Sequence, residues 1–189
     1  MSTYLVAVVV SDFKQINETN QENSKQLALS ALANPSVANQ LDYSIKVLRS
    51  TVDGFGKALG YPYNLPKLDM VGLPDFGSGA MENWGLMTFR ETGLLYDDKI
   101  MSSIASKQSI RNVIAHEVAH QWFGDLVSPL WWDYLWLNEG FARYFQNHMF
   151  SKVNLRFDNF SLKFSIYKVQ FKIFRFRTKN RGNYPNNLS

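Results

Sequence analysis

Two of the three histidines in this sequence lie four residues apart, in the segment His116-Glu-Val-Ala-His120. No other feature constrains the fold as strongly, because residues four apart share one face of an α-helix and can both reach a single ion. Two imidazoles on adjacent turns suit zinc, and Glu117 projects beside them. The alternative is an ordinary helix with two histidines on a polar face. The specificity of the motif favours the metal site, so we expect His116 and His120 to be zinc ligands.

A third ligand has to come from elsewhere, because a catalytic zinc usually has three protein ligands and keeps its fourth position for water. Glu139 is the best candidate, since the 18 residues between it and His120 allow one helix to end, a turn at Pro129 and an antiparallel helix. Within Trp136-Leu-Asn-Glu-Gly-Phe-Ala142 it is the one acidic residue of an otherwise apolar stretch, and an unpaired buried carboxylate is costly. The alternative is a partly exposed Glu near a helix start, which the helix dipole favours.

Apolar residues recur at helical spacing in three segments of the chain. The first helix is expected from about residue 37 to 59. Asn34-Pro35 is a start signal for it, and Gly60 suits its end. The second helix contains residues 110–121 and carries both histidines of the motif. The third is expected from about Tyr134 to Met149.

Three segments have the composition of β-strands. Thr3 to Val10 is apolar and mostly β-branched, which indicates a strand buried on both faces. No second strand of that kind follows closely, so we expect it to be the last strand of a sheet whose other strands lie outside this chain. Two short strands, Leu68 to Leu73 and Trp84 to Arg90, flank the Gly-rich stretch Gly77-Ser-Gly-Ala80. The polar residues from Ser11 to Ser36 are expected to form a connector.

The net charge of +4 is unevenly distributed. Residues 1–150 hold 11 Lys and Arg against 15 Asp and Glu, whereas residues 151–189 hold nine against one. The acidic body lacks the basic groove that nucleic-acid binding requires, so we expect no nucleic-acid partner for it. The chain has no cysteine, which excludes disulfides and Cys-based metal sites. Its longest apolar run, Tyr4 to Val10, is far shorter than the about 20 residues of a membrane span.

Residues 151–189 form a divergent basic tail rich in Asn, Lys and Phe. Their apolar residues alternate from Leu162 to Ile173, as in a strand, with a phase slip at Tyr167. The sequence offers no sheet edge for such a strand to join. Disorder or poor packing is therefore the alternative for this tail.

Two motifs together, Gly79-Ala-Met-Glu-Asn83 and His116-Glu-Val-Ala-His120, followed by Glu139, resemble the M1 family of zinc aminopeptidases. The resemblance is to the gluzincin branch related to aminopeptidase N. It runs from Met1 to about Phe150, and residues 151–189 are expected to lie outside it. A general zincin endopeptidase shares the histidine helix and the distant Glu but is not expected to carry the first motif. Further matching segments are Pro74-Asp-Phe76, Trp84-Gly-Leu86, Gln121-Trp-Phe-Gly-Asp125 and Trp131-Trp132.

The resemblance implies an aminopeptidase that removes N-terminal residues from peptides and holds one Zn²⁺ per chain. It assigns the metal to His116, His120 and Glu139, and it makes Glu117 the general base that takes a proton from the water on the zinc. Glu82 is implied to bind the free α-ammonium group of the peptide by charge-assisted hydrogen bonds. The implied substrate-binding segment is Gly79, Ala80, Met81, Glu82 and Asn83.

The resemblance also implies the fold class, which is α/β of the α+β kind. We expect a partial, thermolysin-like zincin catalytic domain with one leftover strand of an N-terminal β-sandwich. The expected domains are that strand in residues 1–13, a connector in 14–36, the partial catalytic domain in 37–150 and the tail in 151–189.

One element of the family is not found in the sequence. The family uses a tyrosine to hold the oxyanion, and its position is expected past Ser189, since neither Tyr167 nor Tyr184 has a matching context. The alternative function is therefore a truncated, non-catalytic zinc-binding remnant, or an interaction protein whose basic aromatic tail binds nucleic acid or anionic lipid. The location of this chain stays open, although the branch it resembles contains plasma-membrane and extracellular ectoenzymes.

Overall fold

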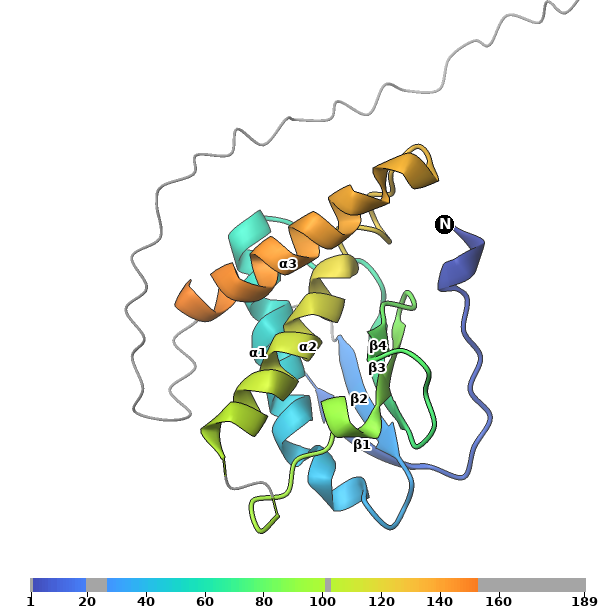
Figure 1. Ribbon diagram of the computed structural model, residues 1–189, viewed down its shortest axis with the longest axis vertical. Helices are drawn as coiled ribbons and strands as arrows, with labels where there is room; N and C mark the ends of the chain where they lie inside the picture. Colours follow the sequence, from blue (N-terminus) through green and yellow to red (C-terminus); the bar gives the residue numbers. More distant parts are fainter. Residues whose placement is uncertain (1, 20–26, 101–102, 153–189) are drawn as a thin grey trace, which may run out of the picture.

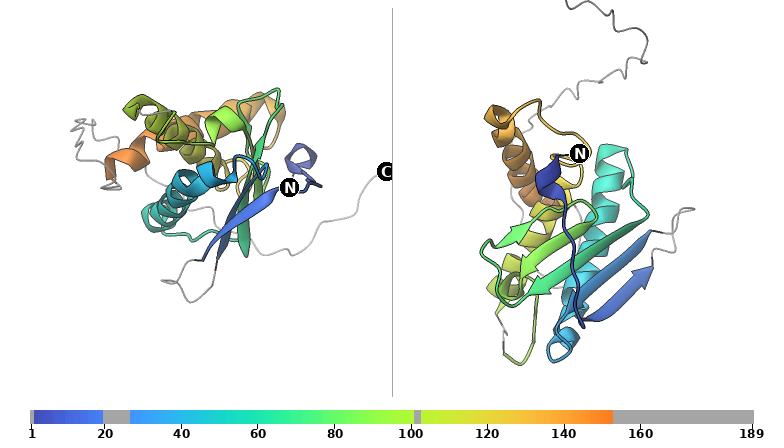
Figure 2. Two further views of the ribbon diagram at one scale, coloured as in Figure 1. Left: turned by 90° about the horizontal axis from the view of Figure 1, so that it is seen from below. Right: turned by 90° about the vertical axis from the view of Figure 1, so that its right-hand side faces the viewer.

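The computed structural model describes residues 2–19, 27–100 and 103–152 of the chain. Nearly all of the expected tail, and with it the choice between strand and disorder, lies outside the described residues. In the part that is described, three α-helices cover one face of a mixed sheet, and the N-terminal segment runs along the other face (Figures 1 and 2). None of these helices combines the length and the hydropathy that crossing a membrane requires.

Within the described ranges the sheet has five strands, and its two outer strands run antiparallel to their neighbours. Strands β2, β3 and β5 form its parallel centre. The short strand β4 lies at one edge, where Ala80 pairs with Phe89. In spatial order the strands are β1 (Lys14–Thr19), β2 (Ala28–Ala33), β3 (Lys67–Leu73), β5 (Leu86–Arg90) and β4 (Ala80–Met81).

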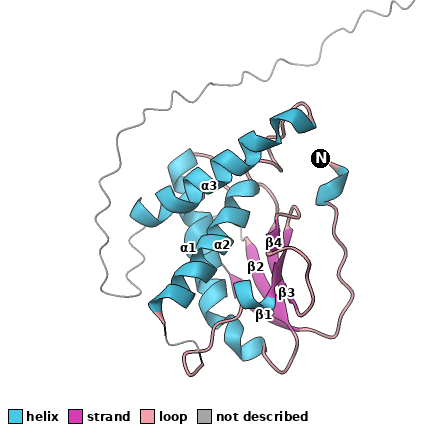
Figure 3. Cartoon of the chain, in the orientation of Figure 1, coloured by secondary structure: helices cyan, strands magenta, loops and turns pink. Residues whose placement is uncertain are grey.

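The three predicted helices are present (Figure 3). Helix α1 (Asp42–Leu59) ends at Gly60, whose φ of 66° is the left-handed conformation that glycine adopts at helix ends. Helix α2 (Ile104–His120) begins six residues earlier than the spacing indicated, because the side chain of Ser103 caps it by accepting from Ser106 N. Helix α3 is Leu135–Lys152. Short 3₁₀ turns η1 (Thr3–Leu5), η2 (Ala38–Leu41), η3 (Glu91–Gly93) and η4 (Trp132–Tyr134) complete the fold.

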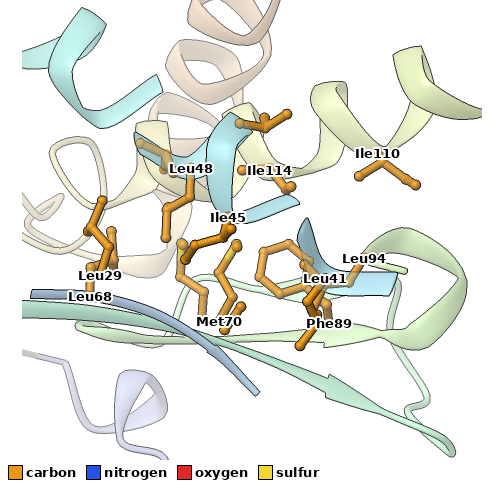
Figure 4. Packing of buried hydrophobic residues seen from close by; sticks show 14 of the residues in the cluster. Leu29, Leu41, Ile45, Leu48, Leu68, Met70, Phe89, Leu94, Ile110 and Ile114 are labelled. Carbon is orange, nitrogen blue, oxygen red and sulfur yellow. The ribbon is translucent and has the colours of Figure 1, made fainter. Parts of the chain in front are cut away.

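The hydrophobic core lies between the sheet and the helices (Figure 4). Alternate residues of a strand share one face, so Leu68 and Met70 of β3 both point to the helices. At the end of α2 the ring of Trp122 stacks on Phe55 of α1 at 5.4 Å, and Phe55 also contacts Phe145 of α3 at 5.8 Å. These contacts fix the three helices relative to one another around the end of α2. The labelled core residues are Leu29, Leu41, Ile45, Leu48, Leu68, Met70, Phe89, Leu94, Ile110 and Ile114.

The connector expected over residues 14–36 is wrong, because this segment contributes β1 and β2 to the sheet. Strand β1 is polar, as exposed edge strands often are, and so it lacks an apolar pattern. Strand β2 consists of Ala, Leu and Ser, which have little intrinsic preference for strands. The start signal at Asn34 is also misplaced, since its side chain accepts from Ser36 N in a turn and the helical residues begin at Ala38.

The strand predicted for Thr3 to Val10 is also absent from the structure. Thr3–Leu5 form the turn η1, and residues 6–13 form no strand. The segment crosses the face of the sheet rather than following an edge, so its backbone has no ladder to join (Figure 2). Leu5 is buried, whereas Val6, Val8 and Val10 are exposed. The assignment of residues 1–13 to a separate domain stays a prediction.

Candidate metal centre

The side chains of His116 and His120 meet at the end of helix α2. The two residues are one turn apart, and their Nε2 atoms lie 3.2 Å from each other. The side chain of His120 is 1 % exposed and that of His116 is 22 % exposed. The site is therefore closed on the side of His120 and reaches solvent beside His116.

Glu139, in the second turn of α3, extends its carboxylate to the same point. Its Oε2 lies 3.2 Å from His116 Nε2, and its Oε1 lies 3.6 Å from His120 Nε2. The ligand atoms of all three residues are within 4.8 Å of one another. The Glu139 side chain is nevertheless 55 % exposed, so the expectation of a buried carboxylate in an apolar stretch is wrong. The first turn of α3 lies at the surface, where Trp136 is exposed as well.

Both imidazoles are held by a second partner. His120 Nδ1 lies 3.0 Å from the carbonyl oxygen of Phe123, and His116 Nδ1 lies 3.2 Å from Oε1 of Gln146. Because both partners are acceptors, each ring donates through Nδ1 and keeps the Nε2 lone pair for a metal. Burial, followed by the charge of His120, lowers the pKa of His116, which favours the neutral form that a metal ligand needs. This donor set fits zinc with one open position.

Glu117 lies beside these residues and is 6 % exposed. A carboxylate oxygen of Glu117, one of Glu82 and a ring nitrogen of His120 lie within 4.8 Å of one another. Burial raises the pKa of Glu117 to about 9, and the charges of Glu82, Glu139 and Asp125 add to the shift. All the neighbours whose charges contribute to this shift are carboxylates. A cation in the site is therefore needed to stabilise the ionised form of Glu117.

The segment that precedes Glu82 runs along the edge of the sheet. Ala80 and Met81 form β4, which pairs with β5 on one side only in the described structure. Gly79 adjoins it, and its carbonyl accepts a hydrogen bond from Arg90 N at 2.9 Å. Ala80 and Met81 therefore form an extended sheet edge, whereas Gly79 lies in a bend directly before it.

Glu82 and Asn83 follow this edge strand, and both are buried. The Asn83 amide accepts from the Thr88 hydroxyl at 2.9 Å and donates to the carbonyl of Leu5 at 3.3 Å. The hydroxyl of Tyr4 donates to Glu82 Oε1 at 3.5 Å. The turn η1 thus covers Glu82 and Asn83 from the face opposite the helices.

Several residues around the site were missed by the sequence analysis. Gln146 follows Glu139 by seven residues, which is two helical turns, and this spacing could have indicated that the two share a face. Phe123 contributes only its backbone carbonyl, for which side-chain patterns carry no signal. Asp125 is also buried, and burial with the charge of Glu82 raises its pKa to about 8.

The pKa of Glu117 leads to a prediction for the metal-free protein. The folded pKa of about 9 exceeds the ordinary 4.5, so between these values the folded state holds a proton that the unfolded state has released. The free energy of unfolding of the metal-free protein therefore falls as the pH rises from 4.5 to about 9. We expect metal-free Glu117→Gln to melt at least about 3 °C above wild type at pH 8, the shift that roughly 1 kcal/mol causes in a domain of this size.

The two proteins should melt together near pH 4, where Glu117 is protonated in both states. Exposed Asp133→Asn is the matched control and should follow wild type. Some decline with pH remains in the variant, because Asp125 titrates in an overlapping range. Equal melting temperatures for wild type and Glu117→Gln at pH 4 and pH 8 would contradict the raised pKa. The measurement is thermal unfolding in a chelating buffer, followed by circular dichroism.

Comparison with known proteins adds a family match. The sequence model described as "Peptidase family M1 domain" matches residues 43–178. The chain is 48% identical over 146 residues to endoplasmic reticulum aminopeptidase 1 of Mus musculus, covering 77% of this chain and 15% of that protein. It is 49% identical over 146 residues to aminopeptidase N of Canis lupus familiaris, covering 76% and 15%. Aminopeptidase A of Gloydius brevicauda is 47% identical over 156 residues, covering 82% and 16%.

The extent of these matches differs from the expectation in two ways. The chain spans about 15% of the length of the relatives that it matches. The family match continues to residue 178, so it passes about Phe150, where the sequence analysis ended the resemblance. The boundary between residues 150 and 151 is therefore not a boundary of the match.

Proposed function

The chain belongs to peptidase family M1, and from this premise we propose that it is the metal-binding and amine-binding part of a zinc aminopeptidase. The observation that carries the proposal is the convergence of His116 Nε2, His120 Nε2 and the Glu139 carboxylate within 4.8 Å. The carboxylates of Glu117 and Glu82 lie next to them, as a peptidase of this kind requires. A mixed sheet with helices on one face is compatible with a partial, thermolysin-like zincin domain.

We assign the zinc ion to His116, His120 and Glu139. Zinc held there supplies a Lewis acid for the scissile carbonyl and lowers the pKa of water towards about 7. The Nδ1 bonds to Phe123 and Gln146 keep the two imidazoles turned towards the metal position.

Glu117 is proposed as the general base, which takes a proton from the attacking water and passes it to the leaving amine. Its buried position beside His120 supports this role, because the carboxylate lies next to the metal position without belonging to the proposed ligand set. The raised pKa of Glu117 belongs to the site without a cation. A metal ion and a substrate amine bound there would lower that pKa by their positive charge and would favour the ionised form that acts as a base.

Glu82 is proposed to bind the α-ammonium group of the substrate, with the backbone of Gly79, Ala80 and Met81 alongside the peptide and Asn83 at the end of this segment. The open edge of β4 supports the backbone role, because an extended peptide can add to a sheet edge. A buried carboxylate next to the metal position suits a substrate whose reacting bond is one residue from its amine. For the whole protein we propose a location on the secretory route or at the cell surface, because the similar mouse protein is an endoplasmic reticulum aminopeptidase.

The proposal predicts the metal content of the purified chain. Wild type should hold about one zinc per chain, and His120→Ala or Glu139→Ala should remove most of it, because two protein ligands seldom hold zinc tightly. The control is His148→Ala, which changes the one histidine outside the cluster and should keep the metal. The measurement is elemental analysis after dialysis against limiting zinc. Equal zinc content in wild type and both ligand variants would contradict the assignment of these residues as zinc ligands.

A further inference from the structure

We propose that Gln121 is the positioning residue that holds Glu82 in place relative to the metal-binding helix. The inference rests on the proposed function, since it takes Glu82 to be the group that binds the substrate amine. Gln121 directly follows His120, the last residue of α2, and is 1 % exposed. Displacement of this side chain would therefore disturb both His120 and Glu82.

The amide of Gln121 forms four hydrogen bonds. Its Nε2 donates to the backbone carbonyl of Glu82 at 3.0 Å and to Asp125 Oδ2 at 2.9 Å. Its Oε1 accepts from Gly85 N at 3.1 Å and from the Tyr63 hydroxyl at 3.1 Å. Two donors and two acceptor positions are thereby all used, which leaves the side chain a single orientation.

Two of these bonds hold the backbone at one tight turn. Leu86 N donates to the Asn83 carbonyl at 2.9 Å, and Gly85 has a φ of 82°, which non-glycine residues rarely adopt. Gln121 bonds to Glu82 just before this turn and to Gly85 within it. The turn that places the Glu82 carboxylate is therefore attached to the helix that carries His120.

The Glu82 side chain has little other support in the described residues. Its Oε1 accepts a hydrogen bond from the Tyr4 hydroxyl at the long distance of 3.5 Å. The position of the carboxylate consequently depends on the backbone at residues 82–85. A substrate amine and a metal ion must be bound a fixed distance apart, because misplacement of about 1 Å can cost a hundredfold in rate. Gln121 links the backbone of Glu82 to the end of the helix that carries His120.

The test compares two probes on the zinc-loaded chain. Leucine hydroxamate carries an α-amine and a metal-chelating group, and 4-methylpentanohydroxamic acid lacks only the amine. The ratio of their dissociation constants, measured by calorimetry, reports amine recognition independently of turnover. For wild type we expect a preference of about 10- to 100-fold for the amine, the range given by hydrogen bonds to a charged group.

Gln121→Met keeps the length of the side chain and removes all four hydrogen bonds. We expect it to lower the amine preference about tenfold while about one zinc is retained. Gln146→Met is the matched control, because it changes another buried Gln that bonds to His116 instead. It should weaken zinc binding, by about 10- to 100-fold as for other partners of metal ligands, and leave the amine preference unchanged. In a Glu82→Ala background, Gln121→Met should have no further effect on the preference.

The outcomes separate the two proposals. If wild type shows no amine preference, or binds neither hydroxamate, the proposed function fails. If wild type has the preference and Glu82→Ala abolishes it, but folded Gln121→Met retains it, only the inference on Gln121 is overturned. If Gln121→Met does not fold, Tyr63→Phe removes one partner of the amide, and we expect a preference lowered by a smaller factor. An unchanged preference in Tyr63→Phe would then give Gln121 a purely structural role and overturn the inference.

Discussion

Glu117→Gln is expected to reduce kcat by about 10² to 10⁴-fold while the zinc content stays at about one, because general acid–base groups contribute by factors of this size. Gln has the shape of Glu and can keep the packing of a residue that is 6 % exposed. It has no carboxylate to accept the proton of the attacking water. The lost activity would therefore belong to proton transfer and not to a disrupted helix.

Turnover is measured best where the rest of the enzyme is present. A suitable protein is a chimera that carries the matched 146-residue segment of this chain in place of its counterpart in the mouse relative, to which it is 48% identical. The assay uses an alanyl anilide with zinc analysis of the same samples. Near-normal kcat in metal-loaded Glu117→Gln would show that Glu117 is not the base. Zinc binding without turnover in the unmutated chimera would instead support the alternative of a non-catalytic remnant.

The same substitution is expected to stabilise the metal-free protein at pH 8, as argued from the raised pKa of Glu117. Loss of activity with a gain of stability is the pattern of a residue that is retained for chemistry at a cost to the fold. A residue that is needed only for packing would lose stability on substitution. The pair of measurements on one variant therefore tests the role of Glu117 more sharply than either alone.

The helices could be predicted from the sequence because their signals are local. Apolar residues at steps of three and four define the buried face of α1, and Gly60 ends it by its own conformational freedom. The His116 and His120 spacing has the same local character, since one helical turn fixes which face both share. Elements whose pattern is contained within a few turns of one helix were therefore predicted with the right type and approximate bounds.

The strands of the first 36 residues could not be predicted from their own sequence, because they form by pairing with neighbouring strands of the sheet. The polar strand β1 forms by pairing with β2, and β2 in turn pairs with β3, whose residues lie far along the chain. Thr3 to Val10 shows the opposite failure. Its strong β composition predicted a strand, but a strand needs an edge to pair with, and the segment crosses the sheet face instead.

The candidate site was likewise predicted only where its signals are local in the sequence. Its metal-ligating residue types and Glu117 were expected from spacing and resemblance, and the structure brings their side chains together. The partners that orient the histidines were not expected. Gln146 reaches His116 only once α3 has packed against α2, and the partner of His120 is the backbone carbonyl of Phe123, for which side-chain patterns carry no signal. Gln121 likewise bonds to a turn that lies 36 residues earlier in the chain, at Gly85. Tertiary packing determines such long-range hydrogen bonds, and the spacing of residues in the sequence does not indicate them.

Blocking the N-terminus of the substrate is expected to lower kcat/KM by about 10- to 100-fold in the chimera, because acetylation removes the charge that Glu82 is proposed to bind. One hydrogen bond to a charged group contributes about 1.5–3 kcal/mol, and each 1.4 kcal/mol corresponds to a factor of ten. Glu82→Ala should lower kcat/KM for the free peptide by a similar factor, and it should have little further effect on the acetylated one.

The comparison of the two substrates in the two proteins isolates the amine contact. A general disturbance of the site by Glu82→Ala would slow both peptides equally, whereas loss of amine binding slows the free peptide alone. Glu82→Gln refines the argument, since it keeps a hydrogen-bond acceptor without the charge and should fall between wild type and Glu82→Ala. Ready cleavage of acetylated peptides by the unmutated chimera would mean that no free amine is required. The segment from Gly79 to Asn83 would then serve an endopeptidase, in which Glu82 has some role other than holding the end of the substrate.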